Sequence, residues 1–191
     1  MYFIDKLRVI SLLVLAIFLT ACGDNLMPSG DDKRPPVIAG TEGYLPTQKA
    51  KNFTLNRVDE QAVVLANYLD TGSDPADAVL IYFTMWCSTC AAHTSDIVST
   101  MRPLFANDNV RFLVVDYVSG SLADTIREKE NNISDSWGLE VLSDYQNIVK
   151  DQLHGGMGVT VIIDSDGTIL YNQDYGNGLK VIEALNEAIA S

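Results

Sequence analysis

The sequence contains few cysteines, and their number excludes two common roles for this residue. Only Cys22, Cys87 and Cys90 occur among the 191 residues. Exported domains that rely on a disulfide framework use several pairs, and a four-cysteine zinc site needs four thiolates. If Cys22 carries a lipid, Cys87 and Cys90 are the remaining thiols. A single pair excludes both the framework and the four-cysteine zinc site.

Basic residues are also scarce. The chain has 13 Lys and Arg against 25 Asp and Glu, which gives a formal net charge of −12. No basic stripe runs along it, so nucleic acid is not an expected partner. The excess of acid favours solubility, and an acidic rim that selects cationic partners is the alternative.

The N-terminal apolar run, residues 9–21, is too short to cross a bilayer. It spans about 13 residues, whereas a membrane-spanning helix needs about 20. It follows Lys6 and Arg8 and fits the apolar part of a signal peptide. Its end, Leu19-Thr20-Ala21-Cys22, resembles the bacterial lipobox. The alternatives are an ordinary signal peptide with an incidental cysteine, or a cytoplasmic protein with an apolar N-terminus.

The lipobox resemblance implies that residues 1–21 are a lipoprotein signal peptide and that Cys22 is diacylated after cleavage. The protein would then be anchored to a membrane by lipid, on the periplasmic side. Gly23 rather than Asp follows the cysteine, which favours the outer membrane over the inner one. Residues 22–51 are polar, hold four of the six prolines and show no sustained periodicity. They predict a flexible tether to a domain at residues 52–191.

Within this domain, strand and helix patterns alternate. An apolar run rich in β-formers at 77–85 predicts a buried central strand. The predicted order is an alternating segment and helical turn at 53–69, this strand, a helix at 87–101 limited by Pro103, a strand at 110–118, a helix at 121–132, a strand at 138–144, a short helix at 145–153, a hairpin at 159–175 and a helix at 179–190 with Leu179, Ile182, Leu185 and Ile189 inward. This order predicts an α/β fold with a mixed sheet and helices on both faces.

The two remaining cysteines occur where the central strand turns into a helix. Cys87 is expected at the helix N-terminus, where unpaired N–H groups and the helix dipole stabilise a thiolate. Cys90, one turn later, is placed to attack a mixed disulfide formed at Cys87 and to release the product. Trp86 is expected to shield one side of the site. A redox dithiol that cycles through a Cys87–Cys90 disulfide is therefore favoured over half a metal site or an inert link.

Three segments resemble thioredoxin-fold proteins, most closely the membrane-anchored thiol–disulfide oxidoreductases of the TlpA/ResA type. They are "FTLNRVDEQAVVLANYL", "VLIYFTMWCSTC" and "GMGVTVIIDSDGTIL", and with their surroundings they cover roughly residues 52–190. The resemblance implies a thioredoxin-like fold and disulfide exchange with exported proteins. Most such relatives are reductants that receive electrons from a membrane donor. No cofactor is implied.

The sequence departs from this family at several site positions. Counted without gaps, the family's cis-proline position falls on Gly158, after Met157, and we expect both residues to border the substrate groove. Ile81 replaces an acidic residue of thioredoxins. His93 stands where related proteins place a glutamate thought to move protons. We therefore expect His93 to act as a base for Cys90, whose pKa burial in an apolar site would raise.

Two other functions remain open at this point. Cys87, Cys90 and His154 are a candidate Cu(I) ligand set, as in the Sco copper chaperones, although the cysteine spacing differs from theirs. A peroxiredoxin-like peroxidase is the third reading. It is supported by Thr84, three residues before Cys87, and weakened by Leu80, which stands where that family needs proline.

Overall fold

A fully buried strand lies at the centre of the fold. All seven residues of β5 (Ala78–Thr84) are buried, as expected of a run of β-branched, aromatic and aliphatic side chains. The strand pairs in parallel with β6 (Val110–Asp116) and antiparallel with β8 (Val159–Asp164). The computed structural model that shows this arrangement describes residues 36–190. The predicted signal peptide, the lipidated Cys22 and the tether up to residue 35 lie outside these residues.

The main sheet has seven strands in the order β4-β3-β7-β6-β5-β8-β9. Because β5, β6 and β7 run in parallel, their C-terminal ends share one edge of the sheet. Ligand and active sites of open α/β sheets form at this edge. The other strands are β3 (Thr54–Arg57), β4 (Ala62–Val64), β7 (Glu140–Ser143) and β9 (Ile169–Asp174).

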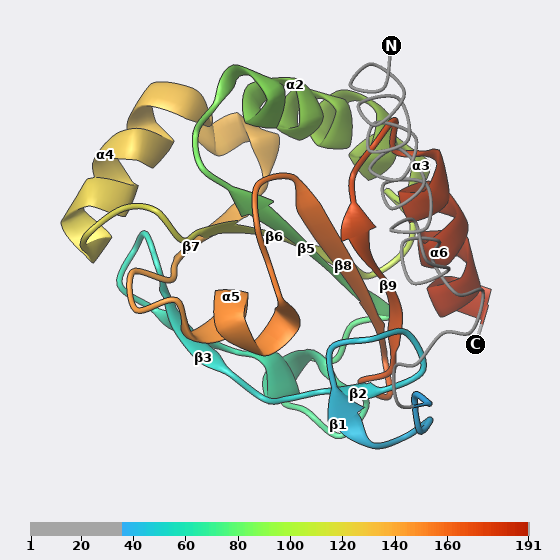
Figure 1. The fold of residues 1–191 in the computed structure, drawn as a ribbon. Coiled ribbons are helices and arrows are strands. Elements are labelled where there is room, and N and C mark those ends of the chain that lie inside the picture. Colours follow the sequence, from blue (N-terminus) through green and yellow to red (C-terminus); the bar gives the residue numbers. More distant parts are fainter. Residues whose placement is uncertain (1–35, 191) are drawn as a thin grey trace, which may run out of the picture. The chain divides into compact units, whose positions relative to one another are not determined.

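Helices cover both faces of the sheet, and two apolar cores lie between the layers (Figure 1). The core on one face contains Cys90, Ile133 and Leu185, and the core on the other contains Leu65 and Leu153. The first face carries α2 (Ser88–Asp96), α4 (Leu122–Asn132) and α6 (Leu179–Ala190), and the second carries the short helices η2 (Leu65–Tyr68) and α5 (Ile148–Leu153). A further 3₁₀ turn, η4, spans Asp135–Trp137. The predicted α/β class, with a mixed sheet between helices, is confirmed.

The helix that follows the cysteines continues further than predicted. After α2 the chain forms a π-helical turn, η3 (Ile97–Met101), and then a last helical turn, α3 (Arg102–Leu104), which contains Pro103. Proline lacks an N–H and clashes with the carbonyl four residues earlier in a regular α-helix. The wider π-turn, in which the Arg102 N–H donates to the Ile97 carbonyl, is placed directly before the proline. The helix therefore ends at Leu104, one residue after Pro103.

The folded unit also begins earlier than residue 52. It starts at Val37, and a small parallel pair, β1 (Glu42–Gly43) and β2 (Lys49–Ala50), precedes β3. The N–H of Thr47 donates to the Ile169 carbonyl at 2.8 Å, and the Ile169 N–H donates to the Gln48 carbonyl at 2.8 Å. These bonds cover the first part of the edge strand β9. The predicted tether is thus wrong for its last part, which packs against the hairpin.

The closing helix packs Ile182 and Ile189 against the core as predicted, and both are partly buried. Leu185 is buried as expected, but Leu179 is 59% exposed. Alanines and a valine, which allow close approach to the sheet, form the rest of the buried stripe: Val181, Ala184 and Ala188. In the described part of the chain, no helix is long and apolar enough to cross a membrane.

Candidate active site

Cys87 and Cys90 lie at the C-terminal edge of the parallel strands. Cys87 is the N-cap residue of α2, with extended backbone angles, and its Sγ accepts a hydrogen bond from the Cys90 N–H at 3.2 Å. The two Sγ atoms are 2.7 Å apart, and both thiols are free. Cys87 is half-buried, whereas Cys90 is 1% exposed. The expected position of the pair at a helix N-terminus is confirmed.

The turn before the cysteines is conformationally constrained. Trp86 has a φ of 60°, in the left-handed region that bulky residues rarely adopt. Its backbone N–H donates to Thr84 Oγ1 at 3.1 Å, and its indole packs against the core beneath α2. Such constraints concentrate at functional sites, where the surrounding structure holds them. Here the constraint fixes the direction in which Cys87 leaves the strand.

The environment of Cys90 differs from the sequence expectation. Burial raises the pKa of this thiol, as predicted. Hydrogen bonds outweigh burial in the dithiol form and lower the pKa below its usual value. They come from the Cys87 side chain, the backbone N–H groups of Met85 and Cys87, and the Thr84 hydroxyl. The predicted rise in the Cys90 pKa is therefore wrong for the dithiol form, because the neighbouring donors stabilise the thiolate by hydrogen bonds.

His93 lies one turn after Cys90 and contacts the central strand. Its Nδ1 is 3.1 Å from the hydroxyl of Tyr82. The imidazole stacks on the ring of Tyr175, with the centroids 4.5 Å apart and the planes at 29°. Burial lowers the pKa of His93, and the carboxylates of Asp96 and Asp174 oppose this change. The imidazole is therefore predominantly neutral at pH 7 and is able to accept a proton.

Two tyrosines of this site were missed by sequence reasoning. The hydroxyl of Tyr82 is 3.1 Å from Nδ1 of His93, and Tyr82 belongs to the same buried cluster as Cys90. The Tyr175 hydroxyl donates to Asp96 Oδ2 at 2.5 Å. A usable signal existed for Tyr82, because strand alternation places it on the same face of β5 as Leu80, toward α2. No signal existed for Tyr175, which is 79 residues from its partner.

The loop opposite the dithiol contains Met157 and Gly158. Met157 is 52% exposed. Gly158 has a φ of 77°, and its N–H donates to the Phe83 carbonyl at 3.1 Å. A Cβ at this position would lie 3.7 Å from the His93 ring. Gly158 therefore lies beside His93, with a positive φ that proline cannot adopt.

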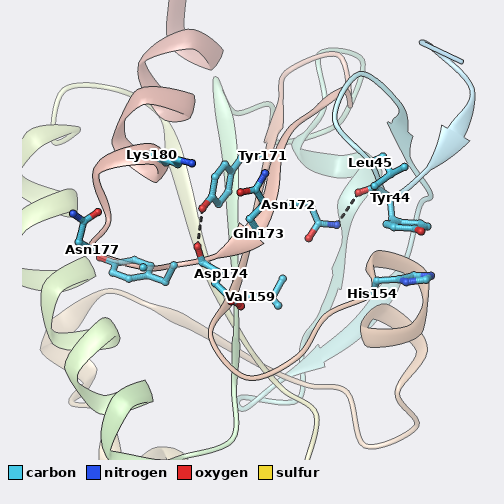
Figure 2. Close-up of a pocket in the computed structure, with 12 residues that line it drawn as sticks. Tyr44, Leu45, His154, Val159, Tyr171, Asn172, Gln173, Asp174, Asn177 and Lys180 are labelled. Carbon is cyan, nitrogen blue, oxygen red and sulfur yellow. Dashed lines mark hydrogen bonds between the residues drawn. The ribbon is translucent and has the colours of Figure 1, made fainter. Parts of the chain in front are cut away.

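His154 does not join the cysteines. It ends α5, and its ring stacks on Tyr44 with centroids 3.7 Å apart (Figure 2). Both rings line one side of a cavity of about 600 Å³ along β9, and neither cysteine lines it. Among residues 36–190, no three His, Cys, Asp or Glu side chains lie close enough together to hold a metal ion. The alternative copper set of Cys87, Cys90 and His154 is thus not assembled.

Comparison of the structure with solved structures identifies the fold. A protein assigned as a disulfide isomerase from Bacteroides thetaiotaomicron superimposes with a TM-score of 0.61 and 17% identity, over 75% of this chain and 89% of that one. The fold is thioredoxin-like. A protein assigned as the thiol:disulfide interchange protein DsbE from Chlorobium tepidum gives a TM-score of 0.59 and 16% identity, over 74% and 95% of the two chains.

Thioredoxin-like relatives with a different activity are similar to the same degree. The mitochondrial 2-Cys peroxiredoxin of Plasmodium falciparum gives a TM-score of 0.58 and 17% identity, over 76% of this chain and 94% of that one. No family model matches the sequence, and no curated protein matches it. The comparisons therefore establish the fold and do not distinguish between these reactions.

Proposed function

We propose that this protein is a thiol–disulfide oxidoreductase that uses the Cys87–Cys90 dithiol. The observation that carries this proposal is the contrast between two adjacent sulfur atoms, one half-exposed at the N-cap of α2 and one 1% exposed. Disulfide exchange requires one thiolate that a partner can reach and a second that it cannot. Cys87 meets the first requirement and Cys90 the second.

The surroundings of Cys87 favour a protein as the substrate. Met85 precedes the cysteine turn and is 40% exposed, Val118 follows β6 and is 47% exposed, and Met157 is 52% exposed. Exposed apolar side chains beside a reactive group are typical of protein-binding surfaces, and methionine adapts to varied partners. We infer that the substrates are disulfides of exported proteins and that the protein reduces them. The electrons would come from a membrane donor.

His93 has the properties of the general base that Cys90 needs. It is half-buried, its lowered pKa keeps it neutral at pH 7, and it contacts Tyr82, which belongs to the same buried cluster as Cys90. In this proposal Trp86, Met157 and Gly158 border the groove that receives the substrate. Cofactors take no part in the exchange.

Turnover of a disulfide-containing fluorescent peptide in the presence of excess dithiothreitol tests this function. We expect the wild-type protein to accelerate reduction well beyond an equal concentration of free dithiol, and Cys87→Ser and Cys90→Ser to remove the acceleration. A wild-type rate equal to that of the free dithiol would contradict the proposal. Cu(I) titration and peroxide consumption by the same preparation separate it from the copper-binding and peroxidase alternatives.

We further propose that Cys22 anchors the domain to a membrane by lipid, on the periplasmic side and preferably at the outer membrane. The support is the apolar run that ends in Leu19-Thr20-Ala21-Cys22. Labelling of cells with a fatty-acid probe should mark the wild-type protein, and Cys22→Ser should abolish the label. Equal labelling of both proteins, or wild-type protein in the soluble fraction, would refute this anchor.

A further inference from the structure

The hydroxyl group of Tyr82 lies between the buried cysteine and the histidine. It is 3.1 Å from Nδ1 of His93, and Tyr82 belongs to the same buried cluster as Cys90, whose thiol is close enough to raise the Tyr82 pKa. Tyr82 itself is 0% exposed, so water does not compete for these partners. A phenol accepts one hydrogen bond and donates another. With His93 as a neutral imidazole, the tyrosine donates to Nδ1, and the lone pairs of its oxygen remain available to accept the Cys90 proton.

The His93 ring is held in this orientation from several elements. The Tyr175 ring, after β9, stacks on it, and the Tyr175 hydroxyl is fixed by Asp96 of α2. Gly158 lies against the ring, since a Cβ there would be 3.7 Å from its Cε1 and Nδ1. The charged groups near the imidazole are the carboxylates of Asp96 and Asp174. Both stabilise an imidazolium ion, so the ring is able to hold a proton for part of the reaction.

A proton acceptor for Cys90 is needed in one particular intermediate. In the dithiol form the Cys87 side chain is the strongest of the hydrogen-bond partners that lower the Cys90 pKa. Once Cys87 forms a mixed disulfide with a substrate, its sulfur no longer carries a hydrogen to donate. The burial of Cys90, which raises the thiol pKa, remains. Release of the product therefore depends on another group that removes the Cys90 proton.

We propose that Tyr82 is a catalytic residue that relays the Cys90 proton to His93. The Cys90 S–H bond breaks as its proton passes to the Tyr82 oxygen, and the tyrosine's own proton passes to Nδ1 of His93. The Cys90 thiolate attacks the Cys87 sulfur of the mixed disulfide, a Cys87–Cys90 disulfide forms, and the substrate leaves as a thiolate that takes a proton from solvent. The dithiol loses two electrons, the substrate disulfide gains two, and the imidazolium returns its proton to solvent.

This inference rests on the proposed oxidoreductase function, and its test separates the two. The mixed disulfide between Cys87 and a fluorescent peptide is formed, and peptide release is followed by stopped-flow from pH 5 to pH 9. We expect Tyr82→Phe to slow release about 10- to 100-fold at pH 7, at or just below the usual contribution of a general base. Its rate should rise about tenfold per pH unit and approach the wild-type rate near pH 9, because the thiol then ionises unaided. His93→Ala should behave in the same way, and the double variant should be no slower than either single one.

Tyr171→Phe is the matched control, because it removes the hydroxyl of another buried tyrosine that donates to the Asp174 carbonyl. It should leave the release rate and its pH profile unchanged. If wild-type protein releases no peptide, the oxidoreductase function itself fails. If wild type is active and Tyr82→Phe keeps its rate and pH profile, the relay is refuted and the function stands. A defect in His93→Ala alone would refute the role of Tyr82 and favour direct transfer.

A spectroscopic measurement tests the relay independently of any rate. Because Nδ1 accepts the Tyr82 hydrogen bond, neutral His93 should carry its proton on Nε2, which ¹⁵N NMR detects. Tyr82→Phe should shift this tautomer toward a mixture. An unchanged tautomer in Tyr82→Phe would mean that the hydroxyl does not bond to the imidazole, and the relay would be refuted.

Discussion

At the scale of single residues, the site depends on which atoms solvent and substrate reach. The Cys87 sulfur is half-exposed, while Cys90, Tyr82 and Thr84 are almost completely buried around it. On the proposed function, exchange therefore begins at Cys87 and ends at Cys90. The buried Thr84 hydroxyl lowers the Cys90 pKa at a position that solvent does not reach. This division of roles follows from the different exposure of the two residues.

Gly158 provides a test of the loop conformation. The family resemblance implies proline at this position, but the residue has a φ of 77° and donates its N–H to the Phe83 carbonyl. Proline fixes φ near −65° and has no N–H. We expect Gly158→Pro to lower the free energy of unfolding by about 3 kcal/mol. Denaturant unfolding measures the change.

Gly156→Ala is the control for this substitution, because a Cβ there would meet only Val159 Cγ2, at 3.9 Å. Its free energy of unfolding should remain within about 1 kcal/mol of wild type, because an unstrained glycine-to-alanine substitution changes stability by no more than this, usually as a gain. A Gly158→Pro protein as stable as wild type would mean that the loop follows the family conformation instead.

The cysteine pair and His93 were predictable because the three residues lie close together in the sequence. Two cysteines three residues apart at a strand-to-helix junction define a dithiol, and His93 follows one helical turn later. Tyr82 was not predicted because it lies in an apolar run, where a tyrosine is expected simply as a residue that favours strands. Tyr175 and Asp96 meet only through the tertiary fold, so no local pattern reports their contact. The sequence therefore predicted the reacting atoms and missed the groups that position them.

At the scale of elements, the β8–β9 hairpin holds two neighbouring carboxyl groups whose pKa values shift in opposite directions. Burial and a hydrogen bond with Asp166 raise the pKa of Asp164 to about 6, although the Thr168 N–H opposes the rise. Hydrogen bonds from Asp164 and from Lys49 lower the pKa of Asp166. Lys49 comes from β2 and forms an ion pair with Asp166 at 2.5 Å, so the turn ties the N-terminal segment to the sheet.

The raised pKa of Asp164 makes the stability of the domain depend on pH. Between pH 4 and pH 6 the folded protein binds more protons at this group than the unfolded chain does. Its contribution to stability is therefore present at low pH and is lost as pH rises through about 6. Asp164→Asn keeps an oxygen that accepts the Thr168 N–H and cannot ionise. We expect its free energy of unfolding, relative to wild type, to increase by about 1–3 kcal/mol from pH 4 to pH 7.

Denaturant unfolding of both proteins in identical buffers measures this difference, and titrating groups that do not interact with Asp164 cancel in the comparison. A difference that stays constant between pH 4 and pH 7 would show that Asp164 titrates as an ordinary aspartate.

Most elements were predictable because their patterns are long and regular, as in β5 and α4. The departures have local physical reasons. A π-turn before Pro103 carries the helix past the residue expected to limit it. The segment at residues 40–50 has too little apolar periodicity to predict a strand, and it is ordered by backbone hydrogen bonds to Gly167 and Ile169. Bonds of this kind use atoms that every residue has, so side-chain patterns do not report them.

At the scale of the whole molecule, the fold brings three features to one edge of the sheet. The C-terminal ends of β5, β6 and β7 meet there, the dithiol follows β5, and exposed apolar side chains surround it. The predicted lipid anchor would hold this edge near exported proteins at a membrane. The formal charge of −12 on the chain would favour partners that are not themselves strongly acidic.

The central claim is that Cys87 attacks and Cys90 resolves, and trapping of mixed disulfides tests it most directly. Cells that produce Cys90→Ser are quenched with acid, and thiol-linked complexes are separated on non-reducing gels. Cys90→Ser should accumulate disulfide-linked complexes with exported proteins that a reducing agent dissolves, because the resolving thiol is missing. Cys87→Ser should accumulate far fewer, since the remaining thiol is buried. More complexes with Cys87→Ser than with Cys90→Ser would contradict the account.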